Sequence, residues 1–240
     1  MDQRLLNEIN HGQKIVDFSG KLWYWETPAG KLRWKRRVEL LTANVATNML
    51  VLEIGCGPGY LTKELHKKQA KIFAIDISQH LLYVARRNLH EGNVIFSLQN
   101  AYGMGFRDNV FDIIVGSSVL HHLELDDALK EFYRVLKPGG SFYFTEPNMM
   151  NPQIAIQKTF PFVKRFMGDS PDETAFFRWR LKEKIEEYGF TDIEINAFDF
   201  LHPSIPKFLV SFVNHLNSIL ESIPFVAEIA GSLYIEARKR

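Results

Sequence analysis

Short apolar runs alternate with segments of helical spacing between residues 49 and 146, and this alternation constrains the fold more than any other feature. The apolar runs cover residues 49–54, 71–75, 93–98, 111–115 and 141–145, and the helical segments cover 60–68, 81–89 and 126–135. Runs that are apolar on both faces are typical of parallel strands in a sheet covered on both sides by helices. The short connections indicate right-handed βαβ units. The sequence therefore predicts an α/β fold with a mostly parallel sheet.

The segments around this core have a different composition. Residues 147–190 contain four prolines (147, 152, 161 and 171) among aromatic and charged residues, and we predict a lid insertion of short helices and loops. Two further strands are predicted at 191–198 and 231–237. We expect one domain over residues 1–240: an N-terminal helical cap (1–45), a ligand-binding core (46–146), the lid insertion (147–190), and C-terminal strands (191–240) that enclose a helical insertion (204–223).

The composition excludes several classes of protein. The chain is 46% hydrophobic with a net charge of +1, so it is neither disordered nor a general polyanion binder. Its single cysteine excludes a disulfide framework, and no run of 18 apolar residues is present to form a transmembrane segment. The first ten residues are polar and of mixed charge, unlike a signal peptide. We therefore expect a cytoplasmic protein that binds a small molecule.

A glycine-rich loop follows the first predicted strand and runs from Glu53 to Gly59 (EIGCGPG). Glycines allow a backbone to turn sharply and to approach a ligand closely. In an open α/β sheet the loop after the first strand lies where ligands bind. The spacing G-x-G-x-G followed by Tyr60 departs from the dinucleotide fingerprint G-x-G-x-x-G. Glu53 would also repel a pyrophosphate, so the loop suits a ligand with a neutral or positive group.

Four ordered motifs resemble those of the class I S-adenosylmethionine-dependent methyltransferases, in particular the type 11 group. They are VLEIGCGPG at 51–59, Asp76 after the second strand, FDIIVGSSVLHHL at 111–123, and RVLKPGGSF at 134–142. The similarity covers roughly residues 45–146. It implies a Rossmann-like sheet of seven strands, mostly parallel, with helices on both faces. Its last strand would be antiparallel and lie between the fifth and the sixth.

The resemblance implies S-adenosyl-L-methionine as cofactor and S-adenosyl-L-homocysteine as product. The cofactor-binding residues that it implies are Glu53, Gly55, Cys56, Gly57, Gly59, Asp76, Ile77, Asn100, Ala101 and Ser117. The glycines would line the amino-acid end of the cofactor, and Glu53 would lie near its ammonium group or organise the loop. Asp76 would bind the ribose, and Ile77 would cover the adenine. Asn100 stands where relatives often carry aspartate, and its amide oxygen can still accept a hydrogen bond from the adenine amino group.

Methyl transfer from a sulfonium depends mainly on alignment, and a base is needed only when the acceptor must lose a proton. The candidate catalytic residues are His121, His122, Glu146 and His202. Because His121 and His122 are adjacent, they cannot both face one point on a helix. We expect no metal site from them together with Glu124 and Asp126, because this group has no histidine pair at i and i+4.

Three features leave alternatives open. The basic run at 31–37 is either a solvated helix face or a phosphate-binding segment. Trp23, Trp25 and Trp34 either close over the cofactor or hold the N-terminal helices in place. The apolar stripe at 204–223 packs on the domain, lines an acceptor pocket, forms a dimer or touches a membrane. Its polar face has few lysines and arginines, which disfavours the membrane alternative.

We expect methyl transfer from S-adenosylmethionine to an oxygen or nitrogen of a small-molecule acceptor, by in-line displacement, in a monomer or homodimer. The alternative enzyme is an RNA (tRNA) methyltransferase. No NPPY-type motif follows the fourth strand, so nucleic acid is not the expected partner. The remaining alternative is a catalytically silent cofactor-binding protein, which would carry the same binding motifs.

Overall fold

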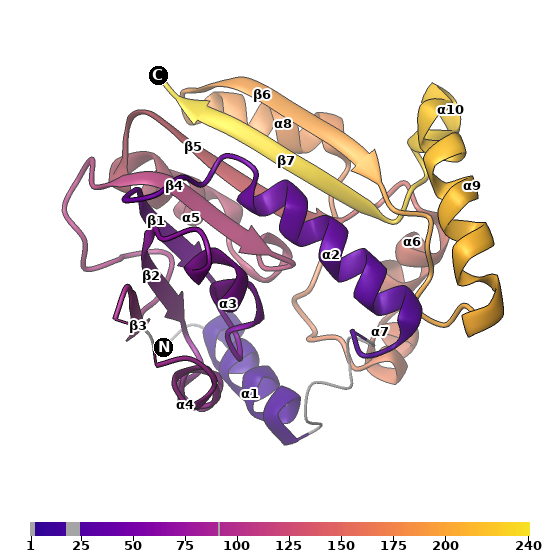
Figure 1. Ribbon diagram of the computed structural model, residues 1–240, viewed down its shortest axis with the longest axis horizontal. Coiled ribbons are helices and arrows are strands. Elements are labelled where there is room, and N and C mark those ends of the chain that lie inside the picture. The colour runs from indigo at the N-terminus through magenta and orange to yellow at the C-terminus, as the bar shows by residue number, and fades with distance from the viewer. Residues whose placement is uncertain (1–2, 18–24, 91) are drawn as a thin grey trace.

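A seven-stranded sheet forms the centre of the computed structural model, which describes residues 3–17, 25–90 and 92–240 (Figure 1). The strands are β1 (Leu50–Ile54), β2 (Lys71–Asp76), β3 (Val94–Leu98), β4 (Phe111–Ser117), β5 (Leu136–Pro147), β6 (Phe190–Phe198) and β7 (Ser232–Lys239). Their order across the sheet is β3-β2-β1-β4-β5-β7-β6. Strands β1 to β5 are parallel, and β7 is antiparallel to both β5 and β6. The predicted fold class is confirmed.

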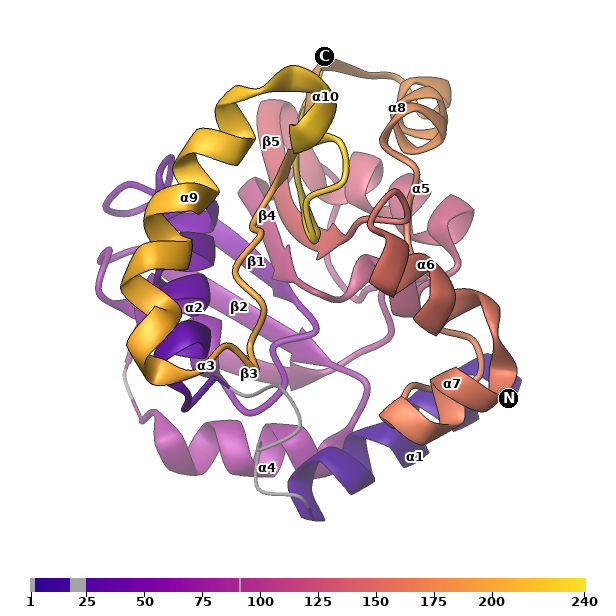
Figure 2. The same cartoon turned by 90° about the vertical axis from the view of Figure 1, so that its right-hand side faces the viewer.

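Helices cover both faces of this sheet (Figures 1 and 2). One face carries α2 (Pro28–Thr42), α3 (Tyr60–His66) and α4 (Gln79–Asn88), and the other carries α5 (Leu125–Val135) and α8 (Arg178–Glu187). Side chains alternate along a strand, so Val51 packs under the first group of helices and Leu52 under the second. Both residues are fully buried, which explains why β1 is a continuous apolar run.

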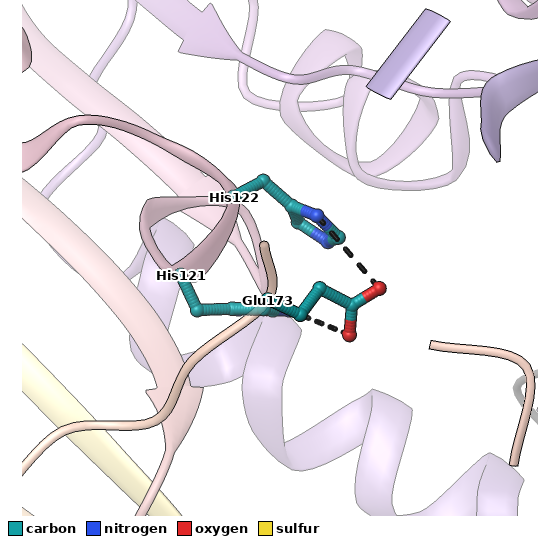
Figure 3. A group of neighbouring side chains, drawn as sticks. All are labelled: His121, His122 and Glu173. Atoms are coloured by element: carbon teal, nitrogen blue, oxygen red, sulfur yellow. Dashed lines mark ion pairs between the residues drawn. The ribbon is translucent and has the colours of Figure 1, made fainter. Parts of the chain in front are cut away.

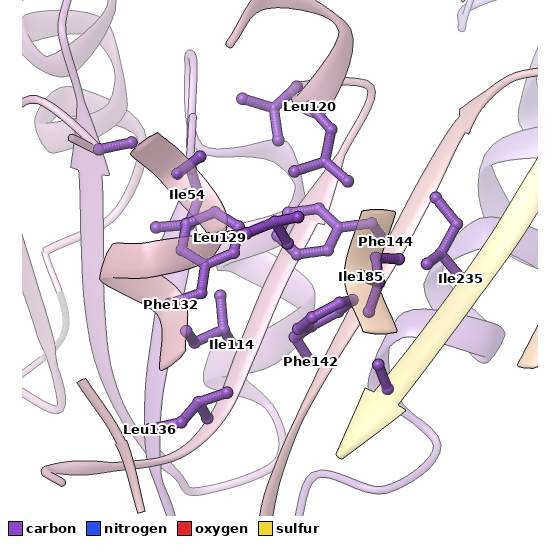
Figure 4. Packing of buried hydrophobic residues seen from close by; sticks show 14 of the residues in the cluster. Ile54, Ile114, Leu120, Leu129, Phe132, Leu136, Phe142, Phe144, Ile185 and Ile235 are labelled. Carbon is purple, nitrogen blue, oxygen red and sulfur yellow. The ribbon is translucent and has the colours of Figure 1, made fainter. Parts of the chain in front are cut away.

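Three phenylalanines lie within the mostly aliphatic core between the sheet and α5 (Figure 4). Phe132 of α5 and Phe142 and Phe144 of β5 are fully buried. The rings of Phe132 and Phe144 stack with their centroids 5.5 Å apart. This packing anchors β5, whose carboxyl end leads into the functional site.

The remaining helices lie toward the carboxyl ends of the parallel strands (Figure 2). They are α1 (Gln3–Asp17), the 3₁₀ turn η2 (Leu120–His122), α6 (Pro152–Thr159), α7 (Pro161–Met167), the 3₁₀ turn η3 (Lys207–Leu209), α9 (Val210–Ser222) and α10 (Pro224–Ala227). The apolar stripe at 204–223 thus contains a 3₁₀ turn and a helix, and Pro224 starts a further short helix because proline fits the first helical turn. Among the described residues, no helix is both long and apolar enough to cross a membrane.

Candidate functional site

A cavity of about 1140 Å³ opens at the carboxyl ends of β1, β2 and β4. Residues of α1, α2, α6, α7 and the segment 199–204 form its other walls. The cavity lies where the strand order reverses, between β1 and β4, and ligands of open α/β sheets bind at that position. Nine of the ten cofactor residues implied by the sequence line it: Glu53, Gly55, Cys56, Gly57, Asp76, Ile77, Asn100, Ala101 and Ser117.

The glycine turn after β1 needs glycine for two different reasons. Gly55 has a φ of +63°, and a Cβ there would lie 2.4 Å from Cγ2 of Val119, so the side chain of Val119 already occupies that space. A Cβ on Gly57 would meet nothing within 4 Å, which leaves open space beside the turn. Gly59 is not among the residues that line the cavity; with a φ of +88° it forms the N-cap of α3 beside Ala85.

The Asp76 carboxylate at the end of β2 ties two loops together. Its Oδ2 accepts a hydrogen bond from the backbone N–H of Gly57 at 2.8 Å, and its Oδ1 accepts one from that of Ser78, also at 2.8 Å. Burial raises the pKa of Asp76, although the backbone donors oppose this effect. Each oxygen has a second lone pair, so the carboxylate can also accept hydrogen bonds from a diol in the cavity.

Glu53 is a buried acid at the end of β1. Its side chain is 1% exposed, and Oε2 has no hydrogen-bond partner in the protein. Burial raises the pKa of Glu53 to about 8, and the charge of Asp76 adds to this effect. An unpaired carboxyl group that faces a cavity suits a cationic ligand, which would lower its pKa again.

The remaining cofactor residues lie along the same wall. Asn100 follows β3, and its Oδ1 accepts a hydrogen bond from the backbone N–H of Tyr102 at 3.1 Å. Ser117 ends β4, with its hydroxyl 3.1 Å from that of Thr145. Cys56 is buried, and burial raises the pKa of its thiol well above the usual value, so it is no nucleophile in this state.

A buried carboxylate holds His121 in place at the other side of the cavity. Oε1 of Glu146 accepts hydrogen bonds from the backbone N–H groups of Val119 and Leu120, both at 2.8 Å. Its Oε2 lies 2.6 Å from Nδ1 of His121. Because a carboxylate can only accept, Nδ1 of His121 carries the proton and Nε2 is left with a lone pair when the ring is neutral. Glu146 itself is fully buried and is not among the residues that line the cavity.

Glu173 of the predicted lid insertion joins the two histidines, a role that was not predicted from the sequence. Its carboxylate faces both imidazoles in Figure 3, 3.9 Å from Nε2 of His121 and 3.9 Å from Nδ1 of His122. Nζ of Lys158 lies 2.6 Å from Glu173 Oε2, and Nε2 of His11 lies 3.8 Å from Oε1. These groups come from four separate segments, so no local sequence pattern could place them together.

Charges in this cluster are distributed unevenly. Burial and the neighbouring charge of His122 lower the pKa of His121. Burial also opposes the charge of His122, but Glu8, 2.7 Å from its Nδ1, and Glu173 outweigh this and raise the pKa. Burial likewise opposes the charge of Glu173, but the two histidines and Lys158 lower its pKa to about 2. Within the pair, His122 therefore binds a proton more readily than His121.

His121, His122 and Glu173 also form the one group among the described residues whose atoms could hold a metal ion, with possible ligand atoms within 4.8 Å of one another. Lys158 already neutralises the Glu173 carboxylate at that point. A divalent cation would meet this ammonium group, so the charges favour the ion pair. His202 lies elsewhere on the cavity wall, where its Nε2 is 2.9 Å from Nε2 of Gln153.

Arg37 is a second residue that the sequence did not reveal. The interpretation of 31–37 as a solvated helix face is wrong for this side chain, which is 4% exposed and lines the cavity. Its Nη2 donates to the hydroxyl of Ser232 at 2.6 Å, while Nε and Nη1 have no hydrogen-bond partner in the protein. Burial, together with the charge of Arg33, lowers the pKa of Arg37 to about 10. A buried guanidinium with two free donors suits a carboxylate ligand.

Aromatic rings complete this wall. The guanidinium of Arg37 lies 5.8 Å from the centroid of Trp25 and 5.7 Å from that of Phe198. Trp25 and Trp34 both line the cavity, with their centroids 5.4 Å apart. They therefore face the cavity and pack on each other, whereas Trp23 lies outside the described residues.

Comparison with known proteins agrees with this geometry. A family model described as a methyltransferase domain matches residues 52–144. The chain is 35% identical over 122 residues to the ubiquinone/menaquinone biosynthesis C-methyltransferase UbiE of Hydrogenovibrio crunogenus, an alignment that covers 47% of each protein. It is 30% identical over 183 residues to the demethylmenaquinone methyltransferase of Lactobacillus johnsonii, covering 65% of this chain and 75% of that one. The chain thus spans between about half and three quarters of the length of these two relatives.

Among solved structures, a possible histamine N-methyltransferase from Thermotoga maritima has the same fold. The TM-score is 0.72 at 16% identity, and the alignment covers 97% of this chain and all of that one. Sheet order, glycine turn and the acid after β2 define a Rossmann-like enzyme that binds S-adenosylmethionine. With the relatives above, they show that the chain belongs to the class I S-adenosylmethionine-dependent methyltransferases.

Proposed function

We propose that this protein transfers the methyl group of S-adenosylmethionine to a small-molecule acceptor that binds beside His121. The observation that carries the proposal is a single cavity with two kinds of wall. One wall holds Glu53, Asp76 and the glycine turn, and the other holds His121, oriented by a buried carboxylate. The presence of both walls in one cavity supports a binding surface for the methyl donor near a histidine that can accept a proton.

The unpaired atoms in the cavity support this position for the cofactor. Glu53 Oε2 would bind the ammonium group of its methionine portion, and Arg37 would bind the carboxylate through Nε and Nη1. Asp76 would accept the ribose hydroxyls, and the space beside Gly57 allows close approach of the ligand. When bound, S-adenosylmethionine supplies an electrophilic methyl group: as the acceptor forms its bond to carbon, the carbon–sulfur bond breaks and S-adenosylhomocysteine remains.

His121 would remove the proton that the acceptor must lose. Its Nδ1 donates to Glu146, which fixes the ring and stabilises the imidazolium that forms when Nε2 accepts a proton. Its lowered pKa keeps the ring neutral near pH 7, so that it is ready to act as a base. Glu146 acts through His121 and is a positioning residue. His202, which also lines the cavity, would contact the acceptor.

The acceptor atom is an oxygen or nitrogen in this proposal, with carbon of an electron-rich ring as the second candidate. Two relatives are named for methylation in quinone biosynthesis, and one of these names specifies a C-methyltransferase. A phenol that loses its O–H proton to His121 becomes nucleophilic both at its oxygen and at carbons of its ring. Methyl transfer to tRNA and a catalytically silent cofactor-binding protein remain the alternatives.

The test separates cofactor binding from methyl transfer. By calorimetry, Asp76→Ala should weaken S-adenosylhomocysteine binding at least tenfold, whereas Asp108→Ala, an exposed control outside the cavity, should bind like the wild type. Labelled methyl from S-adenosylmethionine should appear on a phenol, amine or hydroquinone in an acceptor panel, and mass spectrometry identifies the methylated atom. Wild-type binding by Asp76→Ala would refute the site, and label found only on tRNA would refute the small-molecule acceptor.

A further inference from the structure

The helices around the cavity mouth leave large aromatic side chains exposed to solvent. The most exposed are Phe162 (81%), Phe166 (81%), Phe208 (81%), Phe212 (61%) and Phe225 (91%). Apolar rings normally stay out of water, so several of them on neighbouring helices mark a surface that another phase or molecule covers.

These rings belong to two groups of helices on the same side of the molecule. Figures 1 and 2 both place α7 and α9 at the side where the parallel strands end, with the segment between β6 and η3 running between them. Phe166 and the following Met167 are exposed and also line the cavity. Residues 199–204 form another part of the cavity wall, and the chain continues from them to η3, which contains Phe208. Phe166 therefore lies at the cavity itself, and Phe208 follows a cavity-lining segment in the chain.

The basic residues of this surface lie mainly on α7, because the segment 204–223 has few of its own. Helix α7 (PFVKRFM) contains Lys164 and Arg165 and no acid, and Lys207 precedes Phe208. Acids in or near these helices are paired with cations: Asp169 lies 2.9 Å from Lys158, Glu221 pairs with Arg36, and Glu228 lies 2.6 Å from Arg178. Basic residues interleaved with exposed phenylalanines complement an anionic, apolar phase.

We propose that α7 and the segment η3–α9–α10 form a docking surface for an anionic lipid bilayer. The phenylalanine rings enter the boundary between headgroups and acyl chains, and Lys164, Arg165 and Lys207 bind the lipid phosphates. Docking brings the cavity mouth to the membrane, so a lipophilic molecule can enter the cavity without crossing water. A second copy of the chain fits this surface less well, because a symmetric contact would bring the basic residues of both copies together.

The experiment measures flotation of the full chain with lipid vesicles. We expect the wild type to float with phosphatidylcholine vesicles that contain about one third phosphatidylglycerol, and to bind pure phosphatidylcholine at least tenfold more weakly. Phe162→Ser/Phe208→Ser and Lys164→Gln/Arg165→Gln should each lower binding to the anionic vesicles about tenfold or more. None of these four residues lines the cavity, and both phenylalanines are 81% exposed. The two double variants should therefore unfold at the same temperature as the wild type.

The matched control is Tyr83→Ser, which removes an exposed aromatic ring from α4 and should bind vesicles like the wild type. Docking is refuted if the wild type does not bind anionic vesicles, or if Phe162→Ser/Phe208→Ser binds as well as the wild type. It is also refuted if light scattering shows a dimer that this double variant dissociates. Binding of S-adenosylhomocysteine is measured separately, so failure of docking is distinguishable from failure of the proposed methyl transfer.

Discussion

Replacing Glu53 by glutamine tests whether a protonated acid lies under the glycine turn. Burial raises the pKa of Glu53 from an ordinary value of 4.5 to about 8, so the folded state holds this proton where the unfolded chain releases it. The resulting stability is fully present below pH 4.5 and is lost as the pH rises through 8. Between pH 5 and 7.5 the free energy of unfolding of the wild type should fall by about 3 kcal/mol relative to that of Glu53→Gln, because the glutamine has no proton to release.

Urea unfolding followed by circular dichroism, at several pH values between 5 and 8, gives the free energy of unfolding of both proteins. The quantity to compare is the difference between wild type and Glu53→Gln, because every other titrating group cancels in it. A difference that stays constant across this range would show that Glu53 titrates normally, and the argument from its burial would be wrong. The same substitution should weaken S-adenosylhomocysteine binding in calorimetry at pH 8.5, where the carboxylate is charged, much more than at pH 5.5.

Three further predictions concern the turn, the base and the cluster around it. Gly55→Ala places a Cβ 2.4 Å from Val119 at a positive φ, so it should cost about 1–3 kcal/mol of stability, measured by urea unfolding; an unchanged midpoint would contradict the close approach. His121→Gln should lower kcat about 10²–10⁴-fold while S-adenosylhomocysteine affinity stays close to that of the wild type, and equal losses in both would argue for a structural role. Glu173, with a pKa lowered to about 2, contributes stability that is present above pH 4.5 and lost as the pH falls toward 2. Near neutral pH, Glu173→Gln should therefore be less stable than the wild type, and its free energy of unfolding should fall less as the pH is lowered. If the free energy of unfolding changes with pH by the same amount in both proteins, the ion-pair assignment is refuted.

The fold could be predicted from the sequence because its signals are local. Each buried parallel strand is a short apolar run, and each ends in a glycine, an acid or a polar turn that a reader of the chain can see. The structure differs from the predicted boundaries mainly in the helical insertion at 204–223. Residues 204–223 contain a continuous apolar stripe, but Pro206 and Pro224 limit where a helix can run, so the structure has the 3₁₀ turn η3 before α9 and α10 after it.

The site could be predicted only in part. Glu53, Asp76 and the glycines belong to one motif and are close in sequence, whereas Glu173 reaches His121 across 52 residues and His11 across 162, and no periodicity reports such contacts. The burial of Arg37, although not predicted, does have a signal in the spacing of residues along α2. Positions 29, 33, 37 and 41 lie on one face of α2, where Ala29, Arg37 and Leu41 are buried and Arg33 is partly buried. Spacing by four residues thus separates these two arginines from the exposed Lys31 and Lys35.

The hydrogen bond between Arg37 and Ser232 joins parts of the chain that are synthesised far apart in time. The pair is separated by 195 residues, and both side chains belong to the wall of one cavity. A ribosome delivers the strands β1 to β5 first, and none of their pairings joins residues more than 62 positions apart, so these pairings need no residue of β6 or β7. The cavity wall closes only when β7 inserts between β5 and β6. Ligand binding is therefore a property that a growing chain gains at the end of synthesis, after most of its core has formed.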